Sequence, residues 1–411
     1  MIYGAETMKD EIILAKDYKR AELKDNQQIE DTVAEILSDI RRNGDKAVNS
    51  WSQKIDGQKG KIITLKAFED YDLNPELVEA IKFAHQRIKA FCEFQAKDLK
   101  NNSFNDSFGE FGYKYLPIKR IGAYIPGGRF PLISTSLMTI TPAKVAGCLN
   151  IIACSPSNHP ALLAAASLAG ATQFLHLGGA QAIGALSYGY GEIEAVNMIV
   201  GPGNAYVNSA KAQVQHRTKI DTLAGPSELL IYTENLQNPE WIMFDALAQA
   251  EHDPNAISLV VSTSQQLLEN LYTRTNASEA GQRLIENEQI LFIKCKNQAQ
   301  ALELINEYAP EHLLVTDANI DMNLFINYGS LFIGENSAVA FGDYCTGPNH
   351  TLPTNSAGKN SGGLSVHQFL KVLSTQKVND DGRVELAKYS SILAEAEGLK
   401  FHQKSAEIRK K

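Results

Sequence analysis

The chain has 411 residues, more than a usual single-core domain holds, so two or more domains are expected. Its formal net charge is -8 and no long Lys/Arg cluster offsets the acidic balance, which argues against a nucleic-acid or anionic-membrane partner. The longest stretch of small apolar residues, ALLAAASLAGA, falls well short of a membrane span. These features predict a soluble, cytoplasmic protein.

The five cysteines are odd in number and include no CxxC pair, which argues against a disulfide framework or a thiolate zinc site. Cys148 or Cys154 could be considered as a nucleophile. Both flank the apolar segment AGCLNIIACS, however, where packing in the core is the favoured role. We expect reduced, buried thiols.

Apolar positions recur at helical spacing in residues 27–43 and 74–99, which predicts an N-terminal helical region. YKYLPIKRIGAYIPGG then has the pattern of extended chain that closes in a Gly-rich turn. Beyond it, short apolar runs alternate with helical patterns, from NIIACS to VNMIVGPG, as in successive βαβ units. A second series of this kind runs from ELLIYT to SLFIG.

Two Rossmann-like α/β domains are the natural inference, with N-terminal helices and a helical C-terminal tail. IPGG and LAGPSE bracket the first series, so one domain is expected to be inserted in the other. The expected divisions are an N-terminal arm at 1–18, a first α/β domain at 19–123 and 229–365, a second, NAD-binding α/β domain at 124–228, and a charged helical tail at 366–411, with Gly398 as a break.

LAQAEHDP, residues 247–254, gathers several potential ligands at one predicted helix end. Gln249 and His252 are three residues apart, so on a helix they share a face and could reach one bound ion or small molecule. Pro254 disfavours helical geometry at Asp253, so the helix should stop near His252, where the last carbonyls favour a cation. The alternative is a helix end whose histidine contacts its own carbonyls.

GPGNAYV, residues 201–207, places a Gly-Pro-Gly turn after a predicted strand. Asn204 is a good N-cap there, which would leave backbone amides free to meet a phosphate. An ordinary βα turn is the alternative, since the sequence contains no complete GxGxxG, Walker or HExxH motif.

APEHL, residues 309–313, puts a carboxylate and an imidazole side by side at the start of a predicted strand. Adjacent strand residues point to opposite faces, so a shared site would require irregular backbone. Glu311 and His312 could trade protons near neutral pH, or they could form a solvated surface pair.

GDYCTGPNHTLPT, residues 342–354, packs Asp343, Asn349 and His350 among glycines and prolines, and such loops often serve sites. Asp343 could give an anionic oxygen to a cation near the 247–254 helix end. EAEGLKFH adds Glu397 and His402, although a tail histidine is more often solvated.

Taken in chain order, LAGPSELL, LAQAEHDP, APEHL, GDYCTGPNHTLPT, GGLSVHQFLK and EAEGLKFH, with YIPGG, GGAQAIGA and GPGN upstream, resemble the signatures of the histidinol dehydrogenase family. The match runs from the N-terminal helices to the tail. The resemblance implies a homodimeric, zinc-dependent enzyme. It would oxidise L-histidinol through L-histidinaldehyde to L-histidine, the final steps of histidine biosynthesis, and reduce two molecules of NAD.

The resemblance also implies residue roles. His312 would take the alcohol proton as hydride leaves, and Glu311 would activate water for aldehyde hydration. The ligands of one Zn²⁺ per subunit would be Gln249, His252, Asp343 and, from the neighbouring chain, the partner subunit's His402. Those four residues and His312 would also contact the substrate, together with Ser227, His350 and Glu397. The NAD contacts would be Tyr124, Gln181 and Asn204.

The tail from Val378 onward is predicted to be largely helical, with apolar residues that need a partner surface: Val384, Leu386, Ile392, Leu393 and Leu399. Exchange of the tail between identical subunits would bury them and deliver Glu397 and His402 to the neighbour. Two rival functions remain open. A metal-assisted hydrolase would need no NAD, and an amino-acid-binding protein would need neither Glu311 nor His312.

Overall fold

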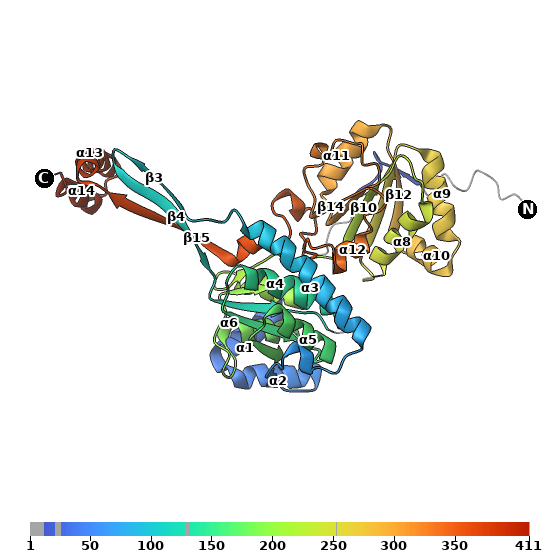
Figure 1. The fold of residues 1–411 in the computed structure, drawn as a ribbon, viewed down its shortest axis with the longest axis horizontal. Coiled ribbons are helices and arrows are strands. Elements are labelled where there is room, and N and C mark those ends of the chain that lie inside the picture. The colour runs from blue at the N-terminus through green and yellow to red at the C-terminus, as the bar shows by residue number, and fades with distance from the viewer. Residues whose placement is uncertain (1–11, 21–25, 128–130, 252, 411) are drawn as a thin grey trace, which may run out of the picture.

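The computed structural model describes residues 12–20, 26–127, 131–251 and 253–410. Two six-stranded sheets and one three-stranded sheet organise this part of the chain. Each six-stranded sheet carries helices and forms a lobe, and the three-stranded sheet projects from them as an arm that ends near the C-terminus (Figure 1). We name the two lobes after their central strands, the β5 lobe and the β10 lobe.

The β5 lobe has the strand order β2-β7-β6-β5-β8-β9, and every strand is parallel to its neighbour except β2, which is antiparallel to β7. Its inner strands are continuous apolar runs because helices cover both faces. The strands are β2 (Lys61–Ile63), β5 (Arg120–Tyr124), β6 (Asn150–Ser155), β7 (Gln173–His176), β8 (Met198–Val200) and β9 (Lys219–Ile220).

Two groups of helices sandwich this sheet, each contributing its apolar face to a separate core. The helices on one face are α1 (Gln27–Asn43), α2 (Asp45–Asp56), α6 (Gly179–Tyr188) and α7 (Ala205–Val214). Those on the other are α3 (Pro75–Ala96), α4 (Ile133–Val145) and α5 (Pro160–Ala169).

The β10 lobe repeats this plan with the all-parallel order β1-β12-β11-β10-β13-β14. Its strands are β1 (Ile12–Leu14), β10 (Glu228–Tyr232), β11 (Ile257–Ser262), β12 (Ile290–Lys294), β13 (His312–Val315) and β14 (Ser330–Ile333). Its helices are α8 (Pro239–Ala250), α9 (Gln265–Asn276), α10 (Glu279–Glu286), α11 (Gln298–Tyr308) and α12 (Val339–Tyr344). Since β1 precedes the β5 lobe and β10 follows it, the β5 lobe is inserted in the β10 lobe.

The arm consists of β3 (Asn102–Asp106), β4 (Gly109–Pro117) and β15 (Leu370–Val378), with α13 (Asp380–Ala396) and α14 (Lys400–Glu407) at its tip. β15 pairs antiparallel with β4 along the whole length of both strands. Most side chains of β15 are exposed, and Figure 1 shows the arm extending away from both lobes. No helix in the described part of the chain is long and apolar enough to cross a membrane.

The mixed α/β class, the inserted lobe and the N-terminal helices confirm the expected fold class. The expected grouping of 19–123 with 229–365 is wrong. The apolar face of α1 packs on α6 and α7, β2 pairs with β7, and β5 is the central strand of the inserted lobe. Residues 26–123 therefore contribute to the β5 lobe and the arm, because that is where their apolar faces find complementary surfaces.

Two further expectations at the chain ends are corrected. Residues 12–14, expected within an N-terminal arm at 1–18, form the edge strand β1 beside β12, and residues 1–11 lie outside the described part. The tail is not helical throughout, because Leu370–Val378 forms β15, where the backbone groups of β4 supply hydrogen-bond partners. From Asp380 onward it is helical, and Gly398, with φ of 73°, separates α13 from α14 as expected.

Candidate active site

Glu311 and His312 lie at the amino end of β13, where the chain enters the sheet from α11. Ala309 has a left-handed backbone, with φ of 50°, so the approach to the strand is irregular, as a shared site requires. The N–H of Ser330 donates to the Glu311 carbonyl at 2.9 Å and fixes this geometry. Glu311 is 7% exposed and His312 is 3% exposed, so the solvated-pair alternative is wrong.

The two side chains meet around the main chain of Glu228, the first residue of β10. Glu311 Oε2 accepts from the Glu228 N–H at 2.9 Å and lies 3.6 Å from His312 Nδ1. The same Nδ1 is 3.3 Å from the Glu228 carbonyl oxygen. His312 Nε2 lies 3.7 Å from Asp343 Oδ1. Carboxylate, imidazole and carboxylate thus form one continuous group, in which Glu311 and His312 are buried and Asp343 is partly buried.

Burial governs the acidity of these carboxyls. It raises the pKa of Glu311 well above its usual value; the Glu228 N–H opposes this, and the charges of Glu228 and Asp343 add to it. Burial also raises the pKa of Asp343 to about 7. A carboxylate with a raised pKa is a better base near neutral pH than an ordinary surface glutamate.

His350 joins this site to the other lobe. Its Nδ1 lies 2.8 Å from the Asp343 carbonyl oxygen, and its Nε2 lies 3.3 Å from the Thr135 hydroxyl on α4. The neighbouring Asn349 donates to the Met138 carbonyl on the same helix at 2.5 Å. The loop that follows α12 is therefore held between the two lobes.

A cavity of about 350 Å³ opens beside these residues. His312, Asn349 and His350 contribute polar groups to its wall, and Phe332 and Phe341 contribute apolar surface. Such a mixture of apolar wall and few polar groups is typical of small-molecule sites.

The predicted metal ligands lie beside this cavity only in part. Gln249 is buried near the end of α8, and its amide nitrogen has no hydrogen-bond partner among the described residues. Amide oxygen and nitrogen are exchangeable by a flip, so Gln249 can offer an oxygen to an ion. Burial raises the pKa of Tyr344, and the charges of Asp343 and Glu251 add to that shift. Glu251 caps α8 and Asp343 lies in α12, so the ends of these two helices are close to each other.

The other predicted ligands are elsewhere. His252 lies outside the described residues. His402 is exposed on α14, and Glu397 caps α13. Figure 1 shows α13 and α14 at the tip of the arm, away from α12, the helix that contains Asp343. In the described ranges, no three His, Cys, Asp or Glu residues are grouped to hold a metal ion. Ser227 directly precedes β10, and its carbonyl accepts from the Ile257 N–H at 3.0 Å.

The predicted NAD contacts gather at the carboxyl edge of the β5 lobe. Tyr124 ends β5, and its hydroxyl accepts from the Gly179 N–H at the start of α6 at 3.3 Å. Gln181 is buried on α6 and donates to Asp56 at 2.8 Å. Asn204 caps α7, accepting from the Val207 N–H at 3.1 Å. The N-termini of α6 and α7 thus face one edge, as dinucleotide sites require.

The sequence prediction missed a buried ion pair beneath the GPGN turn. Lys211 Nζ lies 2.5 Å from Asp221 Oδ1, and both side chains are almost fully buried. Lys211 also donates to the Gly201 carbonyl at 2.9 Å, while Asp221 accepts from the Gly201 N–H at 2.6 Å. A lysine as the one charged residue of the helix segment NAYVNSAKAQV was the available signal.

The cysteines take no part in the site. All five are unpaired, and four are buried, as expected. Burial raises the pKa of Cys148 to about 12 and raises that of Cys154 as well, which disfavours the reactive thiolate.

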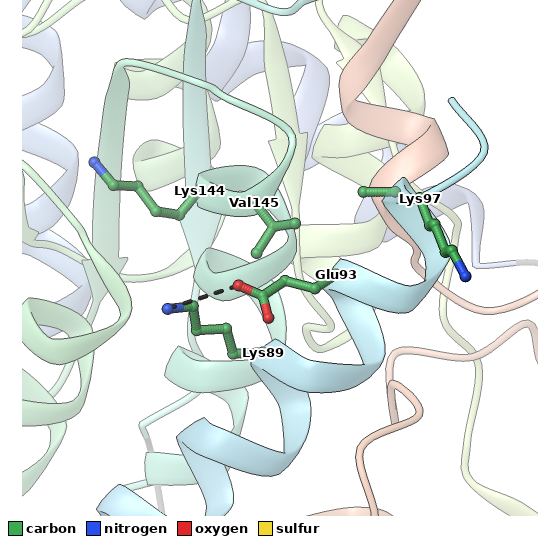
Figure 2. Close-up of a pocket in the computed structure, with 6 residues that line it drawn as sticks. Lys89, Glu93, Lys97, Lys144 and Val145 are labelled. Atoms are coloured by element: carbon green, nitrogen blue, oxygen red, sulfur yellow. Dashed lines mark ion pairs between the residues drawn. The ribbon is translucent and has the colours of Figure 1, made fainter. Parts of the chain in front are cut away.

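A second hollow, of about 400 Å³, lies on the surface between α3 and α4 (Figure 2). Its charged residues are Lys89, Glu93, Lys97 and Lys144, all exposed, and Lys89 lies 3.7 Å from Glu93. Exposed, solvated charges of this kind have ordinary properties, so this hollow offers no catalytic chemistry.

Comparison with known proteins finds similarity over nearly the whole chain. A family model described as histidinol dehydrogenase matches residues 19–410. Histidinol dehydrogenase of Thermus thermophilus is 37% identical over 100% of both chains, and that of Methanosarcina mazei is 39% identical over 92% of this chain and 91% of its own. The crystal structure of histidinol dehydrogenase from Elizabethkingia anophelis superposes with a TM-score of 0.85 at 31% identity, covering 99% of this chain and 96% of that one.

Proposed function

This chain belongs to the histidinol dehydrogenase family, and on that premise we propose that it oxidises L-histidinol through L-histidinaldehyde to L-histidine, with reduction of two NAD, in the final steps of histidine biosynthesis. The observation that carries the proposal is the continuous group of Glu311, His312 and Asp343 beside a cavity. The N-termini of α6 and α7, which face the carboxyl edge of the β5 lobe where NAD would bind, support it.

His312 acts as the base for the alcohol. A carbonyl oxygen can only accept, so the contact of Nδ1 with the Glu228 carbonyl places the ring proton on Nδ1. The lone pair then lies on Nε2, the nitrogen that faces Asp343. From there it takes the hydroxyl proton of L-histidinol while NAD, when bound, accepts the hydride.

Glu311 acts on the second oxidation. The raised pKa of its carboxyl lets it take a proton from water near neutral pH, which hydrates the aldehyde before the second oxidation. Because Glu311 and His312 are held by one residue, Glu228, the two bases serve one substrate position in turn.

The residues fit a bound Zn²⁺, one per subunit, whose ligands would be Gln249, His252 and Asp343 with the partner subunit's His402. Amide oxygen, imidazole and carboxylate suit zinc, and the buried Gln249 amide nitrogen, which has no partner among the described residues, supports a role for this side chain as a ligand. When bound, zinc would polarise and orient the imidazole and amine of the substrate. Ser227, His350 and the partner subunit's Glu397 would complete the substrate contacts, and Tyr124, Gln181 and Asn204 would hold NAD.

Two copies of the chain would share each site as a homodimer. The arm presents exposed apolar side chains that a partner would cover: Phe104, Val372, Tyr389, Ile392, Leu393, Leu399 and Phe401. Figure 1 places α13 and α14 at its tip, away from the lobes of their own chain. Exchange of the arm would bring Glu397 and His402 to the neighbour. Five unpaired cysteines support a reducing, cytoplasmic setting.

The proposal is tested by NADH formation on addition of L-histidinol, with and without a chelator. We expect turnover that stops on chelation and returns with Zn²⁺. Lys89→Ala, in the exposed hollow of Figure 2, is the matched control and should retain full activity. Absence of NADH from the zinc-loaded protein would refute the proposed reaction.

A further inference from the structure

A buried carboxylate that the reaction does not use lies beneath the candidate bases. Glu228 begins β10, and its side chain is 6% exposed. Its Oε1 forms an ion pair with Arg20 and accepts from the Asn355 N–H at 3.3 Å, whereas Oε2 has no hydrogen-bond partner within the described ranges. Burial raises the pKa of Glu228, and Arg20 opposes that shift. Among the described residues, the Arg20 guanidinium is the cation that pairs with this carboxylate.

The Arg20 side chain contacts three segments that are far apart in the sequence. Beyond Glu228, its Nη1 donates to the Tyr308 carbonyl at 2.7 Å and to the Ser356 hydroxyl at 2.6 Å. Its Cζ lies 4.2 Å from the centre of the Tyr308 ring. Ser356 itself donates to the Tyr308 carbonyl at 2.9 Å. Arg20 thus binds the end of α11, the start of β10 and the loop after 353.

Two of these segments, the start of β10 and the end of α11, adjoin the two bases. The main chain of Glu228 donates to Glu311 and accepts from His312, and Tyr308 lies three residues before Glu311 in the irregular approach to β13. A movement at the start of β10 would therefore shift both bases together. Displacements of about 1 Å can cost about a hundredfold in rate.

We propose that Arg20 is a positioning residue of this reaction: through Glu228, its guanidinium fixes the main chain that holds Glu311 and His312. The inference rests on the proposed function and extends it to the N-terminal segment. Without Arg20, Glu228 would remain buried as an uncompensated charge, and the start of β10 would rearrange to reach water. A lysine keeps the charge but lacks the planar fork that reaches three acceptors.

The test compares Arg20→Met, Arg20→Lys, Glu228→Gln and the double variant Arg20→Met/Glu228→Gln in the zinc-loaded enzyme. We expect Arg20→Met to lower kcat by about tenfold to a hundredfold, while KM for NAD changes less than about twofold. Oxidation of L-histidinol and oxidation of L-histidinaldehyde should both fall, because the Glu228 main chain contacts both His312 and Glu311. The kcat of Arg20→Lys should lie between those of Arg20→Met and the wild type.

The double variant separates positioning from general damage. If Arg20 acts through Glu228, removing the buried charge should restore kcat at least about threefold above Arg20→Met. The matched control is Arg120→Met, since Arg120 pairs with Glu194 at 2.6 Å and is 21% exposed against 23% for Arg20. Its kcat should stay at the wild-type level.

A kcat of Arg20→Met within about twofold of wild type, or losses that simply multiply in the double variant, would overturn the inference. If Arg20→Met does not fold, the kcat values of Arg20→Lys and Glu228→Gln test the inference instead. Values within about twofold of wild type for both variants would overturn it. Amide hydrogen exchange of the peptide containing Glu228 gives a readout without turnover, and it should accelerate in Arg20→Met and not in Arg120→Met. Wild-type protein that forms no NADH would instead refute the proposed function, and the exchange result alone would then decide the inference.

Discussion

The two lobes share one strand order, yet their candidate site residues lie at opposite edges of the sheets. In the β5 lobe, Tyr124 and Asn204 follow strands, and the N-termini of α6 and α7 face the same edge. In the β10 lobe, Glu228 and His312 begin strands, beside the C-terminal ends of α8 and α11. Helix N-termini favour anions and C-termini favour cations, so the first edge suits phosphates and the second a metal ion.

The lobes also differ in how they pair buried charged and amide groups. Lys211 and Asp221 satisfy each other and the main chain of Gly201. In the described part of the β10 lobe, the Gln249 amide nitrogen and Glu228 Oε2 have no partner. Unsatisfied buried groups are costly, so their presence indicates a ligand or a catalytic demand, whereas a satisfied pair indicates a structural role.

The largest expected effect tests whether the β10 edge is completed by a second chain. Asp343→Ala and His402→Ala homodimers should each be nearly inactive, because each lacks a proposed zinc ligand at both sites. Co-refolding the two should restore about a quarter of wild-type activity, since half the dimers are hybrids with one intact site. Co-refolded Asp343→Ala and His312→Ala, whose lesions share one lobe, should restore nothing. Equal results for the two mixtures would contradict shared sites.

His312→Ala should lower the rate of alcohol oxidation by about a hundred to ten thousand fold, as loss of a general base commonly does. Zinc content, measured by atomic absorption, should not change, because His312 is not among the proposed ligands. His216→Ala, at an exposed histidine of the β5 lobe, is the control. Loss of zinc from the His312 variant would place this residue in the metal shell instead.

Glu311→Gln should separate the two half-reactions. With L-histidinaldehyde as substrate, we expect a loss of about a hundredfold, and a smaller loss with L-histidinol followed to the aldehyde stage. Glutamine keeps the shape and the hydrogen bond from the Glu228 N–H but cannot take a proton. Equal losses in both half-reactions would refute the division of labour.

Lys211→Met tests the structural role of the satisfied pair. Leaving Asp221 buried without its partner should lower the free energy of unfolding by about 3–5 kcal/mol in urea denaturation. Adding Asp221→Asn should recover part of that loss. Lys89→Met, which removes an exposed pair with Glu93, should change stability by less than about 1 kcal/mol. Similar losses of unfolding free energy in Lys211→Met and Lys89→Met would contradict a structural role for the buried pair.

The smallest expected effect is on NAD binding after zinc removal. Because the two sites lie in different lobes, the dissociation constant for NAD of the chelated protein should stay within about twofold of that of the zinc-loaded protein. Isothermal titration of NAD into both forms measures this. A large loss of NAD affinity on chelation would mean that the NAD site of the β5 lobe and the zinc site of the β10 lobe are not independent.

Local patterns in the sequence were enough to predict much of the fold. The helix expected at 27–43 has those bounds, the helix expected at 74–99 runs from Pro75 to Ala96, and the βαβ rhythm and the insertion are present. Apolar periodicity determines these elements because each helix or strand must bury one side. The adjacent Glu311 and His312, and the Gly/Pro-rich loop with Asp343 and His350, were proposed as site residues from the sequence, and the structure brings them close together.

Only the tertiary structure decided how distant segments combine. The N-terminal helices joined the inserted lobe, and Leu370–Val378 became a strand because β4 was available to pair with it. The contact of Arg20 with Glu228 spans 208 residues, and no local pattern encodes it. Pairing, burial and the resulting pKa shifts depend on surfaces that meet only after folding, which is why the sequence indicated candidate bases but not the residues that hold them.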